Sequence, residues 1–344
     1  MTPRISVIVP LYNKAPYVRR ALDSISRQTF SDFELIVVDD GSTDEGPTLV
    51  SAYGDERVRI IAQANLGPGA ARNRGIAEAR GELVAFLDAD DEWLPDYLAE
   101  SVRLLDEYGP SAASITSGYI EHPAGVSREA MWRARGLTDG LIEVTPDTAP
   151  ALVVSLLAYM SPCTTVARTS VVRKWGGFYE RDYCRYGEDA HLWLKVLLNE
   201  PVAVNLKPLA RIHFEASGPT QTRRSIRPVE PFLIHPEEIE TSCPPHLREL
   251  LTRVLAARAL KTASVLGYWG QWREARALVR RFRVPGAWRL PYYTSSLVSR
   301  TPIGPAIGKL HQMVFATHKR HQLLITAFCT VAPIVVRAVS STSG

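Results

Sequence analysis

The fold is decided by the stretch Gly81-Glu82-Leu83-Val84-Ala85-Phe86-Leu87-Asp88-Ala89-Asp90-Asp91. Five consecutive apolar residues predict a strand buried on both faces of a sheet. The three carboxylates therefore fall where this strand leaves the sheet, the edge at which open α/β sheets bind ligands. Neighbouring carboxylates repel one another unless they share a cation, and a hard divalent ion prefers oxygen ligands. The stretch thus indicates metal and phosphate chemistry.

Short apolar strands alternate with amphipathic helices through the first hundred residues. We expect strands at residues 5–9, 33–38, 58–62 and 83–87, with helices between them. The alternation predicts a parallel sheet covered by helices, and right-handed crossovers make it a nucleotide-binding half of the doubly wound type. The expected fold class is α/β, a Rossmann-like, mostly parallel sheet flanked by helices.

The rest of the chain divides by composition. Further strands are expected near 112–120, 141–145 and 164–167, a helix from Glu188 to about Asn199, and closing strands at 202–206 and 210–214. Five prolines between Arg227 and Pro245 indicate a linker, and a helical hairpin follows, with arms near 247–255 and 271–282. The expected domains are 1–215, with halves 1–110 and 111–215, then a linker at 216–245 and a basic helical region at 246–344.

Charge is distributed unevenly. The overall net charge is +4, but residues 1–204 hold 20 lysines and arginines against 29 acids, a net charge of −9. Residues 205–344 hold 20 against 7, a net charge of +13. The basic part suggests an anionic surface such as lipid headgroups, with a solvated basic helical surface as the alternative. A nucleic-acid arm is disfavoured because regular aromatic stacking positions are missing.

The ends of the sequence guide the expected location. Met1-Thr2-Pro3-Arg4 leads directly into an apolar strand, so we expect no export by a signal peptide. The apolar run Leu323 to Val336 is too short for a spanning helix, which needs roughly 20 residues. We expect a cytoplasmic protein, peripheral at the inner face of the cell membrane, with residues 321–339 as the membrane-surface segment.

A dehydrogenase is disfavoured by the first turn. The Gly-x-Gly-x-x-Gly fingerprint is missing after the first strand, where Pro10-Leu11-Tyr12-Asn13-Lys14 stands instead. After the second strand comes Asp39-Asp40-Gly41, a carboxylate pair with a glycine that allows close approach of the backbone to a ligand. Such a carboxylate can accept hydrogen bonds from a ribose or a pyrimidine base.

Four segments together resemble the family 2 glycosyltransferases of GT-A fold, over about residues 4–215. They are Ser6-Val7-Ile8-Val9-Pro10-Leu11-Tyr12-Asn13, Val37-Val38-Asp39-Asp40-Gly41-Ser42-Thr43-Asp44, Ala71-Arg72-Asn73-Arg74-Gly75 and Asp88-Ala89-Asp90-Asp91. The resemblance implies an inverting enzyme that transfers a sugar from a nucleotide-diphospho-sugar, with a UDP-sugar expected, to a hydroxyl of a glycan, glycolipid or polyprenyl-linked acceptor.

The resemblance also implies roles for residues. Donor-binding residues would be Pro10, Leu11, Tyr12, Asp40, Gly41, Arg72, Asn73, Asp88 and Ala89. Asp40 would hold the base, and Asp88 and Asp90 would hold Mg²⁺ or Mn²⁺, which neutralises the departing diphosphate. His213 would complete the metal site, although a lone strand histidine is more often structural. For Arg72 and Asn73, helix packing is the equal alternative.

The pair Glu188-Asp189 is similar to the family's Glu-Asp motif. Asp189 would take the proton from the acceptor hydroxyl, with Glu188 beside it in the catalytic pair. The N-terminus of the expected helix should lower the pKa of Asp189. The other interpretations are an ordinary pair of acids at a helix start, or a binding protein that keeps the fold without turnover. The sequence identifies neither sugar, acceptor, linkage nor oligomeric state.

Overall fold

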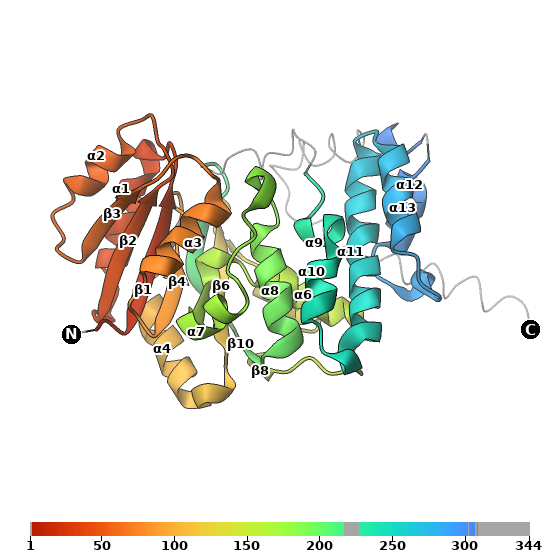
Figure 1. The fold of residues 1–344 in the computed structure, drawn as a ribbon, viewed down its shortest axis with the longest axis horizontal. Helices are drawn as coiled ribbons and strands as arrows, with labels where there is room; N and C mark the ends of the chain where they lie inside the picture. The colour runs from red at the N-terminus through yellow and green to blue at the C-terminus, as the bar shows by residue number, and fades with distance from the viewer. Residues whose placement is uncertain (1, 217–226, 302, 307, 309–344) are drawn as a thin grey trace, which may run out of the picture. The chain divides into compact units, whose positions relative to one another are not determined.

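The computed structural model describes residues 2–216, 227–301, 303–306 and 308 (Figure 1). The chain forms two compact units, Met1–Val254 and Leu255–Gly344. The predicted domain borders at 215 and 245 stay predictions, and the expected membrane-surface segment 321–339 lies outside the described residues.

The first unit begins with alternating strands and helices, as predicted. These are β1 (Ile5–Leu11), α1 (Ala15–Ser26), β2 (Phe33–Asp39), α2 (Gly46–Ser51), β3 (Val58–Ala62), α3 (Pro68–Glu78) and β4 (Leu83–Phe86). The strand order β3-β2-β1-β4 is parallel throughout. All carboxyl ends of these strands therefore lie at one edge of the sheet.

The second part of this unit continues the same sheet in mixed directions. Its elements are β5 (Glu92–Trp93), α4 (Tyr97–Tyr108), β6 (Ser114–His122), β7 (Val126–Ser127), α5 (Glu129–Ala134), β8 (Gly140–Ile142), α6 (Pro150–Tyr159), β9 (Thr165–Arg168), α7 (Thr169–Lys174), α8 (Glu188–Asn199) and β10 (Val202–His213). The full order is β3-β2-β1-β4-β9-β6-β10-β5, with β7 paired to β6 and β8 paired to β10. Strand β9 runs antiparallel to both of its neighbours, β4 and β6, whereas β6 and β10 are parallel.

One long strand replaces the two closing strands that were predicted. β10 covers the first predicted segment and all of the second except Phe214, and its pairing with β6 shifts register on either side of Pro208. Proline has no N–H to donate to a ladder, so it interrupts the pairing without ending the strand. The proline-rich stretch after residue 226 contains two short helices, α9 (Pro231–Ile234) and α10 (Pro236–Ser242).

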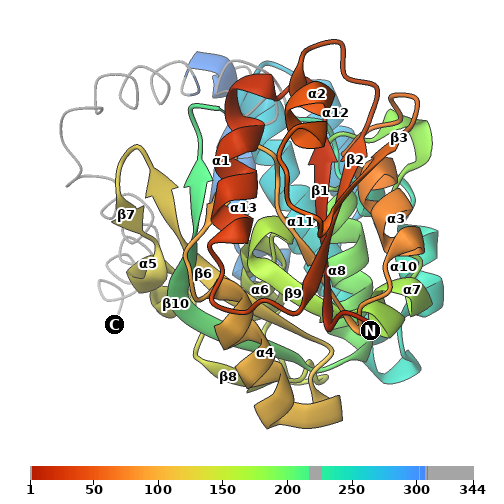
Figure 2. The same ribbon diagram turned by 90° about the vertical axis from the view of Figure 1, so that its left-hand side faces the viewer.

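The main core lies between the sheet and two amphipathic helices. Figure 2 shows α1 and α4 on one side of the sheet and α3 on the other. The alternate residues of β1 that face α1 are fully buried, as are the apolar residues of α1 at helical spacing, namely Ile5, Val7, Val9, Leu11, Val18, Ala21, Leu22 and Ile25. On the opposite face α3 approaches so closely that a Cβ on Gly75 would lie 2.4 Å from Ile8 Cγ2.

The second unit is helical in its described residues. It contains residues 255–268 of α11 (Arg248–Tyr268), then α12 (Trp272–Arg281), a 3₁₀ turn at Ala287–Arg289 and α13 (Tyr293–Ser299). Helices α11 and α13 pack tightly, because a Cβ on Gly267 would lie 2.1 Å from the carbonyl oxygen of Ser299. None of the helices in the described ranges has the length and apolar character needed to span a membrane.

Candidate active site

Three predicted site segments meet at the carboxyl edge of the parallel strands. Leu11 pairs with Asp39 at the ends of β1 and β2, and the Asp40 amide donates to the Leu11 carbonyl at 2.8 Å. The Leu87 amide donates to the carbonyl of Ile8 at 3.1 Å, so Asp88 leaves the sheet beside β1. The structure therefore brings the ends of β1, β2 and β4 together, as the parallel sheet requires.

The Asp40 carboxylate holds the loop that leads into α3. Its Oδ1 accepts hydrogen bonds from Gln63 Nε2 at 2.8 Å and the Leu66 amide at 2.9 Å, and its Oδ2 accepts one from the Gly67 amide at 2.8 Å. The side chain is buried, with 3% of the residue exposed. Three donors within the protein thus already engage the carboxylate that was predicted to hold a nucleotide base.

The other predicted donor residues of the first two loops differ in exposure. Leu11 is fully buried in the core, Pro10 is partly buried, and the Tyr12 ring is 41% exposed. Gly41 turns with a φ of +75° against the Asn65 amide, where a Cβ would come within 3.0 Å. Tyr12 is therefore the side chain of this group that is open to a ligand.

Polar contacts tie these two loops together. Asn13 Oδ1 accepts a hydrogen bond from the Thr43 amide at 2.8 Å, and the Asn13 amide donates to Ser42 Oγ at 3.1 Å. Asp44 accepts from the Ala15 amide at 2.8 Å, at the start of α1. These contacts fix the backbone on both sides of Tyr12.

Arg72 links the acidic run to the Glu-Asp pair. From α3, its guanidinium lies 2.7 Å from Asp88 Oδ1 and 3.0 Å from Glu188 Oε1. The side chain is 5% exposed, and its guanidinium lies 5.2 Å from the centre of the Phe178 ring. One buried cation thus joins residues that are 100 positions apart in the sequence.

Burial and charge shift the pKa values of the three acids around Arg72. Burial would raise the pKa of Asp88, but the Arg72 guanidinium outweighs it, and the net pKa is lowered. Burial and the charge of Asp189 raise the pKa of Glu188 to about 7, although Arg72 opposes them. Burial also raises the pKa of Asp189, with Asp88 adding to the effect and Arg72 opposing it.

The predicted direction of the Asp189 shift was therefore wrong. Asp189 does stand in the first turn of α8, where the helix dipole favours a charged carboxylate. Desolvation disfavours the charged form, and here it exceeds the dipole effect. The result is a more basic carboxylate than the helix position alone implies.

Asp90 is paired with Lys14, a residue that the sequence analysis missed. Lys14 Nζ lies 2.5 Å from Asp90 Oδ2, and it also donates to the carbonyl of Ala216 at 2.8 Å. Arg20 donates to the backbone carbonyl of Asp90. Burial and the charge of Asp88 still raise the pKa of Asp90 despite Lys14. The signal in the sequence was a basic residue shortly after the first strand, directly following Pro10-Leu11-Tyr12-Asn13.

The remaining members of the acidic run are buried. Ala89 is 2% exposed and offers no side-chain contact to a ligand. Asp91 accepts hydrogen bonds from the His213 amide at 2.7 Å and from the Cys163 thiol at 3.3 Å. Asp91 therefore fastens β10 to the acidic run, a structural role for the third carboxylate.

The His213 ring faces carboxylates other than those predicted. Its Nε2 lies 2.9 Å from Glu92 Oε1 and its Nδ1 lies 2.8 Å from Glu215 Oε1, and the His122 ring lies 4.3 Å away. Within the described ranges, two groups bring three ligand atoms within 4.8 Å, and neither joins His213 to Asp88 or Asp90. These groups are His122, His213 and Glu215, and Asp88, Asp91 and Cys163.

Asn73 holds the turn formed by Gly176 and Gly177. Its Nδ2 donates to the Phe178 carbonyl at 2.8 Å, and its Oδ1 accepts from the Phe178 amide at 2.8 Å. Gly177 has a φ of +70°, and a Cβ there would lie 2.3 Å from Asn73 Oδ1. The structure thus supports the packing alternative for Asn73, which positions the segment leading to Glu188.

The segment between this turn and α8 lies beside the Asp40 loop. Tyr183 Oη contacts Asn65 Oδ1 at 2.5 Å, and a Cβ on Gly67 would lie 3.2 Å from the carbonyl of Cys184. Tyr183 is 42% exposed and has a φ of +53°. Residues 179–187 therefore stand next to residues 63–67.

Comparison with known proteins finds similar sequences. The family model "Glycosyl transferase family 2" matches residues 6–159. The putative glycosyltransferase EpsH of Bacillus subtilis is 44% identical over 104 residues, 30% of this chain and 30% of that protein. Glycosyltransferase GlyA of Streptococcus pneumoniae is 33% identical over 210 residues, 58% of this chain and 29% of that protein. The chain thus spans about a third of the length of these relatives.

Two solved structures share the fold. S. aureus TarS 1-349 in complex with UDP-GlcNAc aligns with a TM-score of 0.59 at 20% identity, over 86% of this chain and 91% of that chain. The mannosyltransferase PcManGT from Pyrobaculum calidifontis, in complex with GDP-Man and Mn²⁺, aligns with a TM-score of 0.52 at 21% identity, over 91% and 88%. Residues 6–159 therefore match the family 2 glycosyltransferases, and the chain shares the GT-A fold of these two solved structures.

Proposed function

We propose that this protein is an inverting, metal-dependent glycosyltransferase. It transfers a sugar from a nucleotide-diphospho-sugar, a UDP-sugar by preference, to a hydroxyl of a glycan, glycolipid or polyprenyl-linked acceptor. The observation that carries the proposal is the buried guanidinium of Arg72, which lies 2.7 Å from Asp88 and 3.0 Å from Glu188. Arg72 thereby joins two parts of the site. One is the carboxyl edge of the parallel strands, where such sheets bind nucleotides. The other is Glu188-Asp189, the only Glu-Asp pair at the start of a helix in the described residues.

Asp189 is suited to act as the catalytic base. Its neighbour Glu188 forms an ion pair with Arg72. Asp189 is partly exposed, and its Oδ1 accepts a hydrogen bond from the Ala190 amide at 2.8 Å. The pKa of Asp189, raised by burial, makes the carboxylate a stronger acceptor of the proton from an attacking hydroxyl. A single displacement with one base inverts the configuration at the anomeric carbon.

The carboxylates of Asp88 and Asp90 fit a divalent metal ion. Each has one oxygen paired with a basic side chain, Arg72 or Lys14, and keeps a second oxygen. Burial and the charge of Asp88 raise the pKa of Asp90 despite Lys14, and a divalent cation beside it would favour the charged carboxylate. Mg²⁺ or Mn²⁺ held there would neutralise the diphosphate leaving group. His213 would have to give up Glu92 or Glu215 to serve as a further ligand.

The location is proposed from charge. The net charges of −9 for residues 1–204 and +13 for residues 205–344 suit an enzyme that works on the cytoplasmic side, peripheral to an anionic membrane surface.

The structurally similar proteins TarS and PcManGT are solved with UDP-GlcNAc and with GDP-Man. Both nucleotide classes therefore belong in a donor screen, together with dTDP-sugars.

The decisive experiment measures turnover of UDP-, GDP- and dTDP-sugars with Mn²⁺, before and after removal of the metal with EDTA. In Asp189→Asn the rate should fall by about 10²–10⁴-fold while donor affinity is retained. Asp182→Asn, at an exposed acid in the preceding segment, is the matched control and should keep its rate. NMR of the product should show the anomeric configuration opposite to that of the donor. Donor binding without turnover by the wild type in every combination would favour the non-catalytic alternative, and a product with retained configuration would rule out single displacement.

A further inference from the structure

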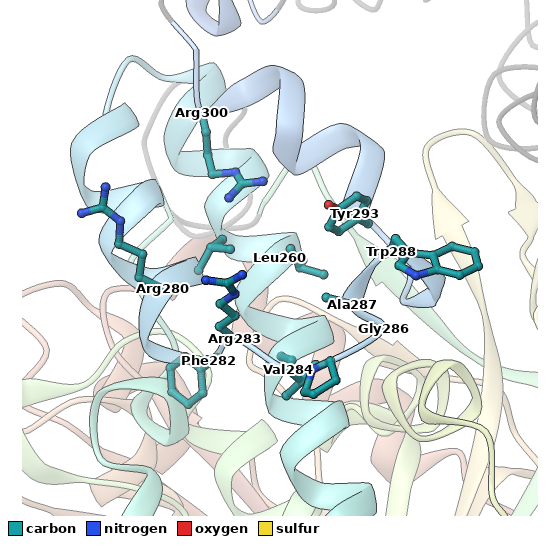
Figure 3. A pocket seen from close by; sticks show the side chains of 13 residues that line it. Leu260, Arg280, Phe282, Arg283, Val284, Gly286, Ala287, Trp288, Tyr293 and Arg300 are labelled. Carbon is teal, nitrogen blue, oxygen red and sulfur yellow. The ribbon is translucent and has the colours of Figure 1, made fainter.

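The helical second unit contains a cavity of its own. Its volume is about 650 Å³, and all of its walls come from residues 256–300. Figure 3 shows the lining side chains, which come from α11, α12, the segment that follows α12, and α13. The proposed transfer reaction uses none of these residues, so the cavity requires a separate explanation.

Three arginines from different elements line this cavity. They are Arg280 on α12, Arg283 in the following segment and Arg300 just after α13. In Figure 3 the side chains of Arg283 and Arg300 extend toward one another, whereas Arg280 points away from them. Such a pair of guanidinium groups offers several N–H donors to one phosphate or carboxylate.

The positive charge of this cavity has no acidic counterpart. None of the lining residues is an aspartate or glutamate. Residues 255–344 contain 13 lysines and arginines against one acid, Glu274. Burial lowers the pKa of Arg300, and the nearby Arg276 adds to this effect against the opposing influence of Tyr293. Charge complementarity therefore calls for an anionic ligand.

The rest of the cavity wall is apolar and aromatic. Leu260 and Val279 lie on α11 and α12, Phe282 and Trp288 lie between α12 and α13, and Tyr293 begins α13. Trp288 is 64% exposed, an unusual position for an indole ring unless it meets an apolar or interfacial environment. A small inorganic anion would leave these apolar walls without a partner.

Further apolar side chains are exposed on the same unit. Leu297 and Val298 on α13 are 45% and 39% exposed, and Ile303 is 64% exposed. Exposed apolar residues beside clustered arginines are typical of proteins that lie on an anionic lipid surface. They agree with the mixed character of the cavity.

We propose that this cavity binds the phosphate headgroup of an anionic membrane lipid. Arg283 and Arg300 hold the phosphate, the apolar wall contacts the glycerol and upper acyl region, and Trp288 sits at the membrane interface. This site is distinct from the sugar-nucleotide site, and it does not depend on the proposed transfer reaction. It also differs from the membrane-surface segment expected at 321–339.

Vesicle flotation of the full chain tests the site. The probes are vesicles of phosphatidylcholine alone and vesicles that also contain phosphatidylglycerol. Wild-type protein should float with the anionic vesicles only. Arg283→Gln is compared with Arg273→Gln, since both arginines are exposed and each substitution removes one positive charge from this unit. If only diffuse attraction to the surface holds the protein, both substitutions should weaken flotation with the anionic vesicles equally. A headgroup site should make the loss of flotation in Arg283→Gln at least fivefold larger than in Arg273→Gln.

Four further measurements keep the outcome clear. Unchanged melting temperatures and unchanged binding of the sugar nucleotide exclude misfolding of the variants. Brominated phosphatidylglycerol should quench part of the wild-type tryptophan fluorescence, and Trp288→Phe should abolish that part. Inorganic phosphate at the concentration of the lipid should not displace the protein from the vesicles.

Several results would overturn the proposal. These are equal loss of flotation in Arg283→Gln and Arg273→Gln, flotation with neutral vesicles, or quenching that persists in Trp288→Phe. Full displacement by inorganic phosphate would reduce the cavity to a simple anion site and would also contradict it. None of these results depends on whether the protein transfers a sugar.

Discussion

Arg72 and Asp88 form an ion pair with 2.7 Å between Arg72 Nη2 and Asp88 Oδ1, at the point where β4 leaves the sheet. The arginine is almost fully buried, whereas the Asp88 side chain is 35% exposed. The pair thus consists of a buried arginine and an aspartate that reaches the surface. This asymmetry leaves the Asp88 carboxylate accessible from the surface.

Replacement of Arg72 should destabilise the fold as well as the site. In Arg72→Gln, the carboxylate of Glu188 is left buried without its cation, and the free energy of unfolding should fall by about 3–5 kcal/mol. Urea denaturation measures this loss. Arg74→Gln, on the exposed side of the same helix, breaks only a surface pair with Glu78 and should cost at most about 1 kcal/mol. Equal losses in the two variants would contradict the bridging role of Arg72.

Asp40 should affect stability and not only affinity for a donor. An asparagine offers one acceptor oxygen where the carboxylate serves three donors, so Asp40→Asn should lower the free energy of unfolding by about 1.5–3 kcal/mol. Hydrogen exchange at the amides of Leu66 and Gly67 should become faster. Asp39→Asn is the neighbouring control, because Asp39 accepts one hydrogen bond, from the Ser42 amide. If Asp40→Asn weakened donor binding at unchanged stability, Asp40 would serve the ligand alone.

The two glycines of the turn before α8 should respond differently to alanine. Both have positive φ angles, so alanine at either position costs about 1–2 kcal/mol of backbone strain. At Gly176 a Cβ meets nothing within 4 Å, but at Gly177 it lies 2.3 Å from Asn73 Oδ1. Gly177→Ala should therefore lower the melting temperature and the transfer rate more than Gly176→Ala. Identical behaviour of the two variants would mean that the Asn73 contact does not hold this segment.

Stability at acidic pH should depend on His191. This residue of α8 is 1% exposed, and its Nε2 makes no hydrogen bond although Glu238 Oε2 lies 3.3 Å away. Burial lowers the pKa of His191 from 6.5 to about 3, with Lys195, Arg181 and His235 adding to the effect. The folded protein therefore disfavours the protonated ring.

The direction of the pH effect follows from this shift. Above about pH 6.5 the ring is neutral in both states and its contribution to stability is complete. As the pH falls, the unfolded chain takes up the proton first, and the free energy of unfolding drops by up to about 1.4 kcal/mol per pH unit until about pH 3. His191→Met should reduce this slope in denaturation experiments between about pH 4 and 6. The exposed residue His246 is the control, and a His246→Met variant that lost the slope would contradict the assignment.

Hydrophobic periodicity was enough to predict the first half of the fold. The strands β1 to β4 and the helices between them lie within a few residues of their predicted positions, because each strand is a continuous apolar run bounded by turn residues. The family assignment depended on the order of four motifs, and the match to residues 6–159 supports it. The antiparallel strand β9 was expected as a strand, but no local signal gave its direction.

Side-chain partners were beyond the reach of the sequence. Lys14 and Asp90 are 76 positions apart, and their contact depends on how the loop after β1 passes over the end of β4. The ring of His213 was expected near Asp90, yet Glu92 and Glu215 compete for its nitrogens. The raised pKa of Asp189 comes from burial by distant segments, which a helix position in the sequence cannot reveal.

Strand β9 also sets off a continuous stretch of the chain that lies outside the parallel strands. It returns the chain to the sheet beside β4, so residues 123–161 form an excursion between β6 and β9, and the short strands β7 and β8 within it pair with β6 and β10. Insertions or exchanges within that excursion leave the pairing of β1, β2 and β4 intact. The excursion can therefore be exchanged as one continuous cassette without touching Arg72 or the two acids that it contacts.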